Sequence, residues 1–489
     1  MSDPHDYKKN ILDTKSKTFC GAKWYNATIW LGHGATTSCH HPPPHKIDPE
    51  EVKKDPSALH NTTYKKLVRK EMQEGVQCKE CEYCWKIENL EQDLISDRVY
   101  KSNIYDDEKL QEAFDSNWRK SFNPINLEIA FDANCNFACS YCNAGFSTTW
   151  AHDVKKNGPY KDLLSDGWGA FATEGNWAQP YGLKNEGNPY IEAFWKWWES
   201  DLQYSLNELR VTGGEATVSK DFWKLVNWFE KNPGCKVNLA VNTNLGIKKD
   251  RLKKLINSSK FIRKLDIYSS NESFGPQSEY IRDGLIWKDW FENSETLLTE
   301  SNAGYHVMLT LNALCLGSLD KFHEAIFELK SKTGKNIYLS YNILRFPSFQ
   351  SITTLPKHIR DERSEYYQKW LDKNKQHLNR HEVDGMDRTI SYIKNVDEGH
   401  SVKELSDLSC RQNDFFNFYS QYDVRRNKVF ARAFGDWPDL IEWYTSLAGN
   451  INHRDISEPI EANAVDWGKD IYDGVIEDAI KQGLVNGPA

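Results

Sequence analysis

The sequence predicts an α/β fold in which a parallel sheet is covered by helices. Between residues 121 and 350, short apolar segments with strand character alternate with segments of helical spacing, as is typical of βα units. The strand candidates are rich in Val, Ile, Leu and Tyr with little alternation, which is expected of strands covered on both faces. Six strands are predicted, at residues 127–131, 208–212, 236–242, 264–269, 305–312 and 336–343.

Two of the intervening helices are marked by their first residues and by one apolar face. Ser219 is a suitable N-cap and Gly234 a stop, and the apolar residues at helical spacing between them are Phe222, Trp223, Val226 and Phe229. A second helix is predicted after Ser318, where the same spacing relates Leu319, Phe322, Ile326 and Leu329. Helices between successive strands imply a parallel sheet with the helices outside.

The composition is that of a globular protein with more than one domain. The chain has 489 residues, of which 27% are charged and 39% hydrophobic, so we expect two or three domains in a soluble protein. The formal net charge of −8 argues against a protein that coats nucleic acid, because such proteins carry a broad basic surface. No run of 18 or more apolar residues is present, so no membrane association is expected.

The cysteines indicate the compartment. The chain has 11 of them, and its polar first residues lack the apolar segment of a signal peptide. An odd number of cysteines without a secretion signal argues against a disulfide framework. We therefore expect a cytoplasmic protein whose cysteines bind metal.

Three cysteines follow the first predicted strand. Cys135, Cys139 and Cys142 have the spacing C-x3-C-x2-C, which places them on a loop at a strand end. A [4Fe-4S] cluster normally takes one cysteine per iron, so this set leaves one iron without a protein ligand. An open coordination position is where a metal site performs chemistry. A zinc loop and buried thiols are the other interpretations, although zinc sites favour C-x2-C pairs.

This spacing resembles that of the radical S-adenosylmethionine (radical SAM) enzymes. The resemblance implies a catalytic [4Fe-4S] cluster on Cys135, Cys139 and Cys142, whose open iron chelates the amino and carboxylate groups of S-adenosylmethionine. It implies that an electron from the cluster cleaves this cofactor to a 5′-deoxyadenosyl radical, which takes a hydrogen atom from a substrate. The six βα units match the partial (β/α)6 TIM-like barrel of that family, in which the strand ends carry the site.

A second motif, Gly213-Gly214-Glu215, ends the second predicted strand. Two glycines let the backbone approach a ligand closely, and the carboxylate can accept hydrogen bonds from an ammonium group. Alone, such a tripeptide is a weak signal. On the strand after the cysteine loop it resembles the motif with which the family holds the methionine amine of S-adenosylmethionine.

Further candidates follow the third and fourth strands. Ser269 and Ser270 end the fourth strand, where a hydroxyl can bond a ribose, and the guanidinium of Arg282 can hold a carboxylate bidentately. A serine-rich turn and a surface arginine are the other interpretation. The resemblance implies that one serine, with Ser270 favoured by spacing, and Arg282 contact S-adenosylmethionine. It also implies that Tyr141 packs near adenine and that Asn244 is a polar contact.

A second cysteine system occupies the first hundred residues. A strand over residues 24–31, a turn and a return strand predict a hairpin that ends at Cys39. The other cysteines of this system are Cys20, before the hairpin, and Cys78, Cys81 and Cys84, which have the spacing C-x2-C-x2-C.

The run Lys79-Glu80-Cys81-Glu82-Tyr83-Cys84-Trp85-Lys86-Ile87-Glu88 resembles the auxiliary-cluster modules of radical SAM proteins, called SPASM and twitch domains. The resemblance implies a second, auxiliary [4Fe-4S] cluster with Cys81 and Cys84 as ligands. Cys20 and Cys39 would complete the set, and Cys78 is surplus or replaces Cys20. Such modules usually follow the barrel, whereas this one precedes it. The alternative is structural zinc bound by Cys39, two later cysteines and one histidine of the His40-His41 pair.

The sequence divides into three predicted domains. Residues 1–120 form the N-terminal auxiliary module, 121–350 the partial barrel, and 351–489 a mostly helical C-terminal cap. About 65 residues separate the cysteine loop from the second predicted strand, and they include the Gly- and Trp-rich run 158–188. A connection of that length suggests a lid or substrate-binding insertion.

The resemblance implies a radical SAM enzyme with a peptide or protein side chain as the favoured substrate class. A small molecule such as a sugar or cofactor precursor is the alternative substrate, and a nucleotide or RNA is the least favoured one. An electron donor such as flavodoxin or ferredoxin is the implied partner. From another class, a non-catalytic iron–sulfur or zinc protein that binds a partner would keep the cysteines without needing Gly213-Gly214-Glu215.

Overall fold

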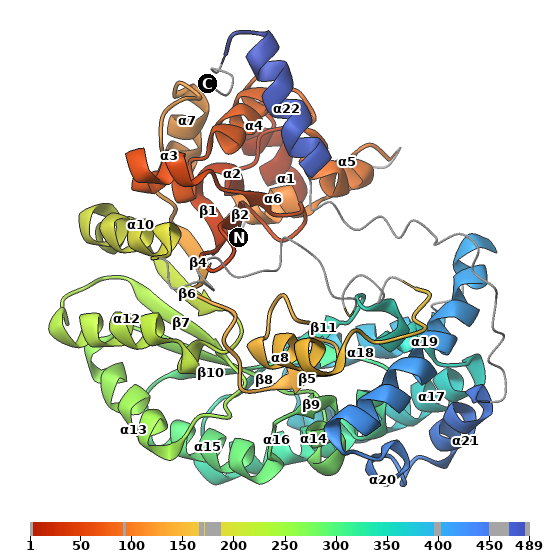
Figure 1. Ribbon diagram of the computed structural model, residues 1–489. Helices are drawn as coiled ribbons and strands as arrows, with labels where there is room; N and C mark the ends of the chain where they lie inside the picture. The colour runs from red at the N-terminus through yellow and green to blue at the C-terminus, as the bar shows by residue number, and fades with distance from the viewer. Residues whose placement is uncertain are drawn as a thin grey trace.

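A nine-stranded sheet lies at the centre of the fold, in the order β11-β10-β8-β7-β6-β4-β1-β2-β3 (Figure 1). The computed structural model describes residues 3–90, 94–165, 171, 187–395, 402–448 and 469–484. The strands of the sheet are β1 (Asn26–Trp30), β2 (Ala35–Thr37), β3 (His45–Lys46), β4 (Asn126–Ala130), β6 (Glu208–Thr212), β7 (Asn238–Thr243), β8 (Leu265–Ser270), β10 (Gly304–Leu311) and β11 (Tyr338–Ile343).

All pairings from β11 to β1 are parallel, and those of β1 with β2 and of β2 with β3 are antiparallel. The predicted α/β class is therefore confirmed, and all six predicted strands are present. Strands β11 and β3 are the edges, and among the described residues no pairing between them closes the sheet. The register sets Trp30 opposite Ala130 and Ala130 opposite Thr212, so the carboxyl ends of β1, β4 and β6 lie side by side.

One face of the sheet is apolar and is covered by helices. Strand β10 alternates strictly, with Tyr305, Val307, Leu309 and Leu311 buried. The hydroxyl of Tyr305 lies 2.6 Å from that of Ser294 in α15, which places this face against the helices. The helices in this layer are α12 (Lys220–Lys231), α13 (Lys249–Ser258), α15 (Trp287–Glu300) and α16 (Leu319–Thr333) (Figure 1).

The other face carries many polar side chains, and in β10 its residues are partly buried, so this strand alternates where little alternation was predicted. Arg210 lies over the ring of Tyr268 at 4.0 Å, and Tyr268 stacks on His306 with ring centres 4.3 Å apart. His306 stacks in turn on Tyr338 at 5.2 Å. Apolar residues such as Met308 share this face and hide the alternation in the sequence.

The N-terminal segment joins the same sheet. The predicted hairpin is present as β1 and β2, although Trp24 and Tyr25 belong to α2 (Ala22–Tyr25). A separate apolar core in this segment includes Tyr7, Leu12 and Trp24. The helices that enclose it are α1 (Pro4–Tyr7), α4 (Thr63–Gln73), α5 (Glu82–Glu88), α6 (Asp97–Ser102) and α7 (Asp107–Asp115); α3 (Pro49–Lys54) packs on α10 (Pro189–Trp197) instead.

The C-terminal part is helical, as predicted, but its last helix packs on a different part of the protein from the others. Its helices are α17 (Lys357–Asn374), α18 (Arg380–Asn395), α19 (Val402–Arg426), α20 (Phe430–Ala433), α21 (Pro438–Leu447) and α22 (Lys469–Lys481). Helix α22 lies on α4 of the N-terminal segment (Figure 1), where Val475 and Ile476 pack against its core. The predicted C-terminal domain, residues 351–489, therefore includes a helix that packs on the N-terminal segment. No described helix is long and apolar enough to cross a membrane.

Helix α19 is tied to the insertion after the cysteine loop. Most of the Gly- and Trp-rich run of this predicted insertion, residues 166–170 and 172–186, lies outside the described residues. In its described part, the backbone N–H groups of Leu164 and Ser165 donate to the carboxylate of Asp414 at 2.7 and 2.6 Å. Asp414 is fully buried, and this burial raises its pKa to about 6.

We expect the Asp414→Asn variant to lose a pH dependence of stability that the wild type shows. Because the folded pKa of Asp414 is about 6 and an unfolded aspartate has about 3.9, the folded state favours the protonated carboxyl. Its contribution is complete below pH ~4 and falls by up to ~3 kcal/mol as the pH rises to ~6. Urea unfolding of both proteins between pH 4 and 7 measures this difference, and parallel curves would contradict it.

Candidate functional site

The cysteine loop lies between β4 and α8 (Thr148–Asn157). All three cysteines of the loop are partly buried, and Cys139 belongs to a short strand, β5 (Ala138–Cys139). This strand pairs in antiparallel fashion with β9 (Arg282–Asp283), which sets Cys139 opposite Arg282. The N–H of Ser140 extends the pairing by donating to the carbonyl of Ile281 at 2.7 Å. Two segments far apart in the sequence thus meet at the central cysteine.

The first turn of α8 holds the loop in place, which sequence reasoning missed. The hydroxyl of Thr148 accepts from the N–H of Cys135 at 3.2 Å, and that of Thr149 donates to the Cys135 carbonyl at 2.6 Å. The indole N–H of Trp150, a fully buried residue, donates to the carbonyl of Cys139 at 2.9 Å. The Ser-Thr-Thr run after Cys142 was an N-cap signal that could have located this helix.

The thiols of the loop are held in a desolvated environment. Burial raises the pKa of Cys135 to about 12 and that of Cys139 to about 11, and it also raises the pKa of Cys142. At Cys139 the nearby Arg282 guanidinium opposes this rise. The metal-free thiols are therefore protonated at neutral pH, and binding of iron as thiolates must release protons.

The three sulfur atoms of the loop are not as close together as the ligands of a single zinc ion. A tetrahedral zinc ion with zinc–sulfur bonds of about 2.3 Å holds its sulfur ligands about 3.8 Å apart. Among the described residues, the sulfurs of Cys135, Cys139 and Cys142 do not all lie within 4.8 Å of one another. An iron–sulfur cluster distributes its thiolates over several irons, so it does not require the sulfurs to lie that close together.

The backbone of Gly213-Gly214-Glu215 lies directly against the cysteine loop. The N–H of Gly214 donates to the carbonyl of Asp132 at 3.3 Å, and that of Glu215 to the carbonyl of Asn134 at 2.7 Å. Gly213 has a φ of +126°, and a Cβ on Gly214 would lie 2.4 Å from the Asn134 oxygen. Both glycines are therefore required by the approach of this loop.

We expect the Gly214→Ala variant to bind less than half of the wild-type iron on this loop. The added Cβ meets backbone carbonyls of Ala133 and Asn134 at 2.5 and 2.4 Å, so the segment before Cys135 must shift. Iron analysis after anaerobic reconstitution measures the loss. Gly234→Ala is the matched control, because a Cβ there meets nothing within 4 Å. Equal iron in both variants would contradict the expectation.

The carboxylate of Glu215 is engaged by its own chain. It is buried and accepts from the Thr217 hydroxyl at 2.6 Å, the Thr243 hydroxyl at 2.7 Å and the Asn244 N–H at 2.6 Å. These bonds join the ends of β6 and β7. The amide of Asn244 also donates to the side-chain oxygen of Asn136 in the cysteine loop at 2.9 Å. Asn244 thus links Glu215 to the cysteine loop. A cofactor amine would have to share the Glu215 oxygens with these donors of the chain.

The two serines at the end of β8 point to opposite sides of the sheet. The hydroxyl of Ser269 is buried and accepts from the indole N–H of Trp290 in α15 at 2.8 Å. It therefore faces the helical layer, because successive residues of a strand alternate between faces. Ser270 lies on the polar face, at the strand end that adjoins the cysteine loop. Of the two predicted serines, only Ser270 lies on the face of the sheet where a ligand could reach its hydroxyl.

Arg282, predicted to hold a cofactor carboxylate, already pairs with a carboxylate of the chain. Its Nη2 and Nε atoms lie 2.5 and 3.1 Å from Oε2 of Glu272. The hydroxyl of Tyr141 donates to Oε1 of Glu272 at 3.0 Å. The remaining Arg282 nitrogen, Nη1, lies 3.8 Å from Sγ of Cys139. Glu272 was missed in the sequence, where the only signal is a charge ten residues before Arg282.

Four of the N-terminal cysteines line one small cavity. The cysteines that line it are Cys20, Cys39, Cys81 and Cys84. Cys78 is buried but is not among the lining residues, and its carbonyl accepts from the indole N–H of Trp85 at 2.8 Å. Lys23, which also lines the cavity, is buried in an ion pair with Glu80. The cavity thus has four thiols, with a cationic side chain beside them.

Glu88, the last residue of the run that resembles an auxiliary module, braces this cavity. Its two carboxylate oxygens accept from Nε and Nη2 of Arg98 at 3.0 and 2.6 Å. Arg98 is fully buried, and its Nη1 donates to the carbonyl of Phe19 at 2.9 Å. Since Phe19 precedes Cys20, this bidentate pair fixes the position of that cysteine.

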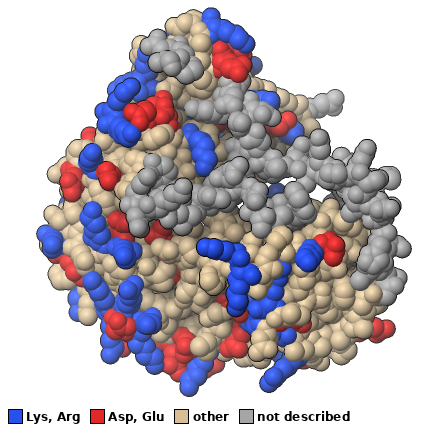
Figure 2. Space-filling model, viewed as in Figure 1, with Lys and Arg blue, Asp and Glu red and all other residues tan. Residues whose placement is uncertain are grey.

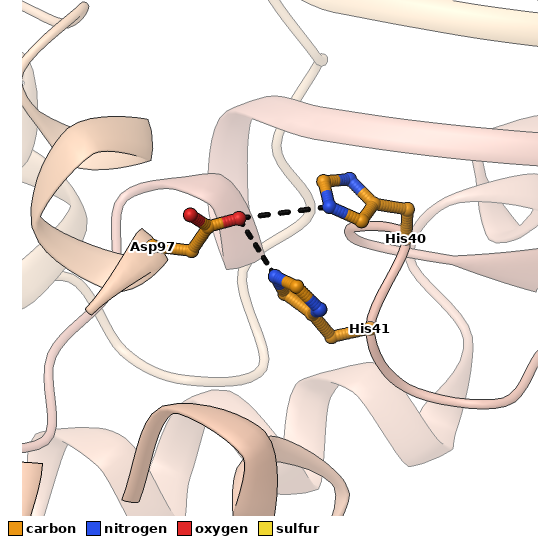
Figure 3. A group of neighbouring side chains, drawn as sticks. All are labelled: His40, His41 and Asp97. Atoms are coloured by element: carbon orange, nitrogen blue, oxygen red, sulfur yellow. Dashed lines mark hydrogen bonds and ion pairs between the residues drawn. The ribbon is translucent and has the colours of Figure 1, made fainter. Parts of the chain in front are cut away.

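His40 and His41 lie beside Asp97 (Figure 3), and His41 and Asp97 also line this cavity. Nε2 of His41 and Nε2 of His40 lie 2.7 and 3.6 Å from Oδ2 of Asp97. Ligand atoms at this spacing can hold a metal ion, but Nζ of Lys101 lies 3.2 Å from Nδ1 of His40. An ammonium donor at Nδ1 leaves the proton of neutral His40 on Nε2, the atom that would face an ion. The group is thus better described as a hydrogen-bonded cluster than as a zinc site.

Comparisons with known proteins assign no role to these residues, since no protein-family model and no curated protein matches the chain. On the face shown in Figure 2, basic and acidic side chains are interspersed. The described residues of that face therefore form no broad basic surface of the kind that binds nucleic acid.

Proposed function

We propose that the chain is a radical SAM enzyme with its catalytic [4Fe-4S] cluster on Cys135, Cys139 and Cys142. The observation that carries this proposal is the meeting of three distant segments at the end of β4. The cysteine loop bonds to the backbone of Gly214 and Glu215 and pairs with β9 at Arg282. In this proposal β4, β6, β7, β8, β10 and β11 are the strands of a partial (β/α)6 barrel.

The residues around the loop have distinct proposed roles. When bound, the cluster supplies the electron that cleaves S-adenosylmethionine to a 5′-deoxyadenosyl radical. The backbone of Gly213 and Gly214 offers carbonyls to the cofactor amine, and Ser270 a hydroxyl to its ribose. Tyr141 and Asn244 line the approach to the cluster, and Trp150 keeps the Cys139 carbonyl in place beneath it.

Anaerobic reconstitution tests the enzyme proposal. With iron, sulfide and a strong reductant, the protein should produce 5′-deoxyadenosine from S-adenosylmethionine, even as slow turnover without substrate. A reduced protein that carries iron and sulfide but forms no 5′-deoxyadenosine would instead support a non-catalytic iron–sulfur protein.

We infer that Cys20, Cys39, Cys81 and Cys84 hold an auxiliary [4Fe-4S] cluster, because these four line one cavity. Four cysteines leave no iron open, so this cluster would carry electrons rather than bind substrate. The amide of Asn26 at the start of β1 donates to the Ser38 carbonyl at 2.7 Å, which places Cys39 near that end. The catalytic loop follows the opposite end of β4, which pairs in parallel with β1, so the two sites lie toward opposite ends of this strand pair.

A second cluster with four cysteine ligands suits the oxidation of a substrate whose electron must be removed. We therefore favour a peptide or protein side chain as the substrate, with a small molecule as the second candidate. The electron donor would be a flavodoxin or ferredoxin.

Two single variants test the auxiliary ligands. Cys20→Ser should lose about four irons per chain, the content of one cluster, whereas Cys78→Ser should keep them, because only Cys20 lines the cavity. Both thiols are buried, so the two substitutions are matched in environment. Loss of iron from Cys78→Ser alone would reverse the assignment, and bound zinc without iron would replace the cluster by a structural zinc site.

A further inference from the structure

Glu272 is a fully buried carboxylate that the catalytic proposal does not use. It follows β8 after one intervening residue, Asn271, has no exposed surface, and lies beside the guanidinium of Arg282, a residue that is 4% exposed. Both carboxylate oxygens have partners, Oε1 the hydroxyl of Tyr141 and Oε2 the guanidinium. Every polar atom of this side chain is therefore assigned within the chain.

The geometry of the pair leaves one edge of the guanidinium for the cysteine loop. Two Arg282 nitrogens, Nε and Nη2, are used by Glu272. Because the guanidinium is planar and rigid, engaging this edge directs Nη1 toward Sγ of Cys139, at 3.8 Å. The pairing of Cys139 with Arg282 across β5 and β9 fixes the two backbones as well.

Stability alone is a weak reason for such a pair. Replacing a buried ion pair with well-packed apolar residues is often neutral or stabilising, because desolvation offsets the attraction. A neutral pair whose positive end points at a sulfur does have an electrostatic effect on that sulfur. Hydrogen bonds to cluster sulfurs and the net charge nearby are among the factors that set the reduction potential of an iron–sulfur centre.

We propose that Glu272 is a positioning residue, which holds Arg282 so that Nη1 donates a hydrogen bond to the sulfur of Cys139 and makes the cluster on that loop easier to reduce. This inference rests on the proposed function, since it requires a cluster on the loop. It gives Arg282 a role toward the cluster in place of the predicted one toward a cofactor carboxylate. Tyr141 supports Glu272 from its other oxygen.

A reductive titration of the reconstituted full-length protein, followed by electron paramagnetic resonance, tests the proposal. The signal that changes on addition of S-adenosylmethionine identifies the cluster with an open iron, and its midpoint potential is then measured without the cofactor. In Arg282→Met this potential should become more negative, because a positive donor that favours the reduced state is lost. Arg282→Lys should shift it in the same direction, since a single ammonium cannot both pair with Glu272 and reach Cys139.

Tyr141→Phe removes the hydrogen bond from Tyr141 to Glu272 and leaves the Glu272–Arg282 pair in place. It should shift the potential in the same direction as Arg282→Met and by less. Arg360→Met is the matched control, because Arg360 is equally buried and its described bonds are to the carbonyls of Leu355 and Ile393. Arg360→Met should leave the potential at the wild-type value.

The outcomes separate the inference from the proposed function. A wild-type protein without any signal that responds to S-adenosylmethionine would remove the proposed function. A responsive signal whose midpoint is the same in wild type and Arg282→Met would overturn the inference while the proposed function stands. An unchanged potential in Arg282→Lys would show that charge alone acts, and would overturn the role of the oriented Nη1.

Discussion

Replacing Cys139 with alanine is expected to abolish formation of 5′-deoxyadenosine and to halve the iron content. Two [4Fe-4S] clusters account for about eight irons per chain, and loss of one leaves about four. Cys139 is the central ligand of the loop, and its backbone stays fixed by β9 and by the Trp150 indole. The variant should therefore fold and keep the auxiliary cluster, so that iron, sulfide and cofactor cleavage report only on the loop.

Cys235→Ala is the control for this experiment. Cys235 is also partly buried, and its described contact is from its thiol to the carbonyl of Gln203 at 3.8 Å. It should keep full iron and full cleavage of S-adenosylmethionine. Full 5′-deoxyadenosine formation by Cys139→Ala would remove the loop from the proposed catalytic site. A fall to no iron at all would mean that both cysteine groups serve one centre.

The strands could be predicted from the sequence because their apolar content is a local property. All six predicted strands are found. The pairing of β1 with β4 could not be predicted, since it joins residues about a hundred positions apart and no local signal specifies a parallel partner. The place of α22 on α4 is a contact of the same long-range kind.

In the candidate site, too, residues with a local signal could be predicted and residues that depend on long-range packing could not. The cysteines and Gly213-Gly214-Glu215 could be found because their spacing is unusual in itself. The choice between Ser269 and Ser270 depends on which face of β8 meets α15, and that is decided by Trp290. Glu272 could not be selected from 70 acidic residues, because a buried carboxylate has no mark in the sequence until its partner is placed.

Burial of the Glu272–Arg282 pair also has a consequence for folding that does not depend on any cluster. Arg282→Met should lower the free energy of unfolding of the metal-free protein by ~3–5 kcal/mol, because it leaves the Glu272 carboxylate buried without its cation. Glu272→Gln in the same chain removes that unpaired charge. The double variant should therefore regain most of the lost stability.

Urea unfolding of the two single variants and the double variant forms a double-mutant cycle that measures this coupling. Glu382→Gln is the matched control, because Glu382 is also fully buried and pairs with a lysine, Lys330, at 2.7 Å. The destabilisation caused by Arg282→Met should be the same with or without Glu382→Gln, since the partner of Glu382 is a different cation. If the double variant of Glu272 and Arg282 were as unstable as the sum of its singles, the two side chains would be independent. The directed guanidinium at Cys139 would then lose its physical basis, because only a coupled pair can fix the orientation of Nη1.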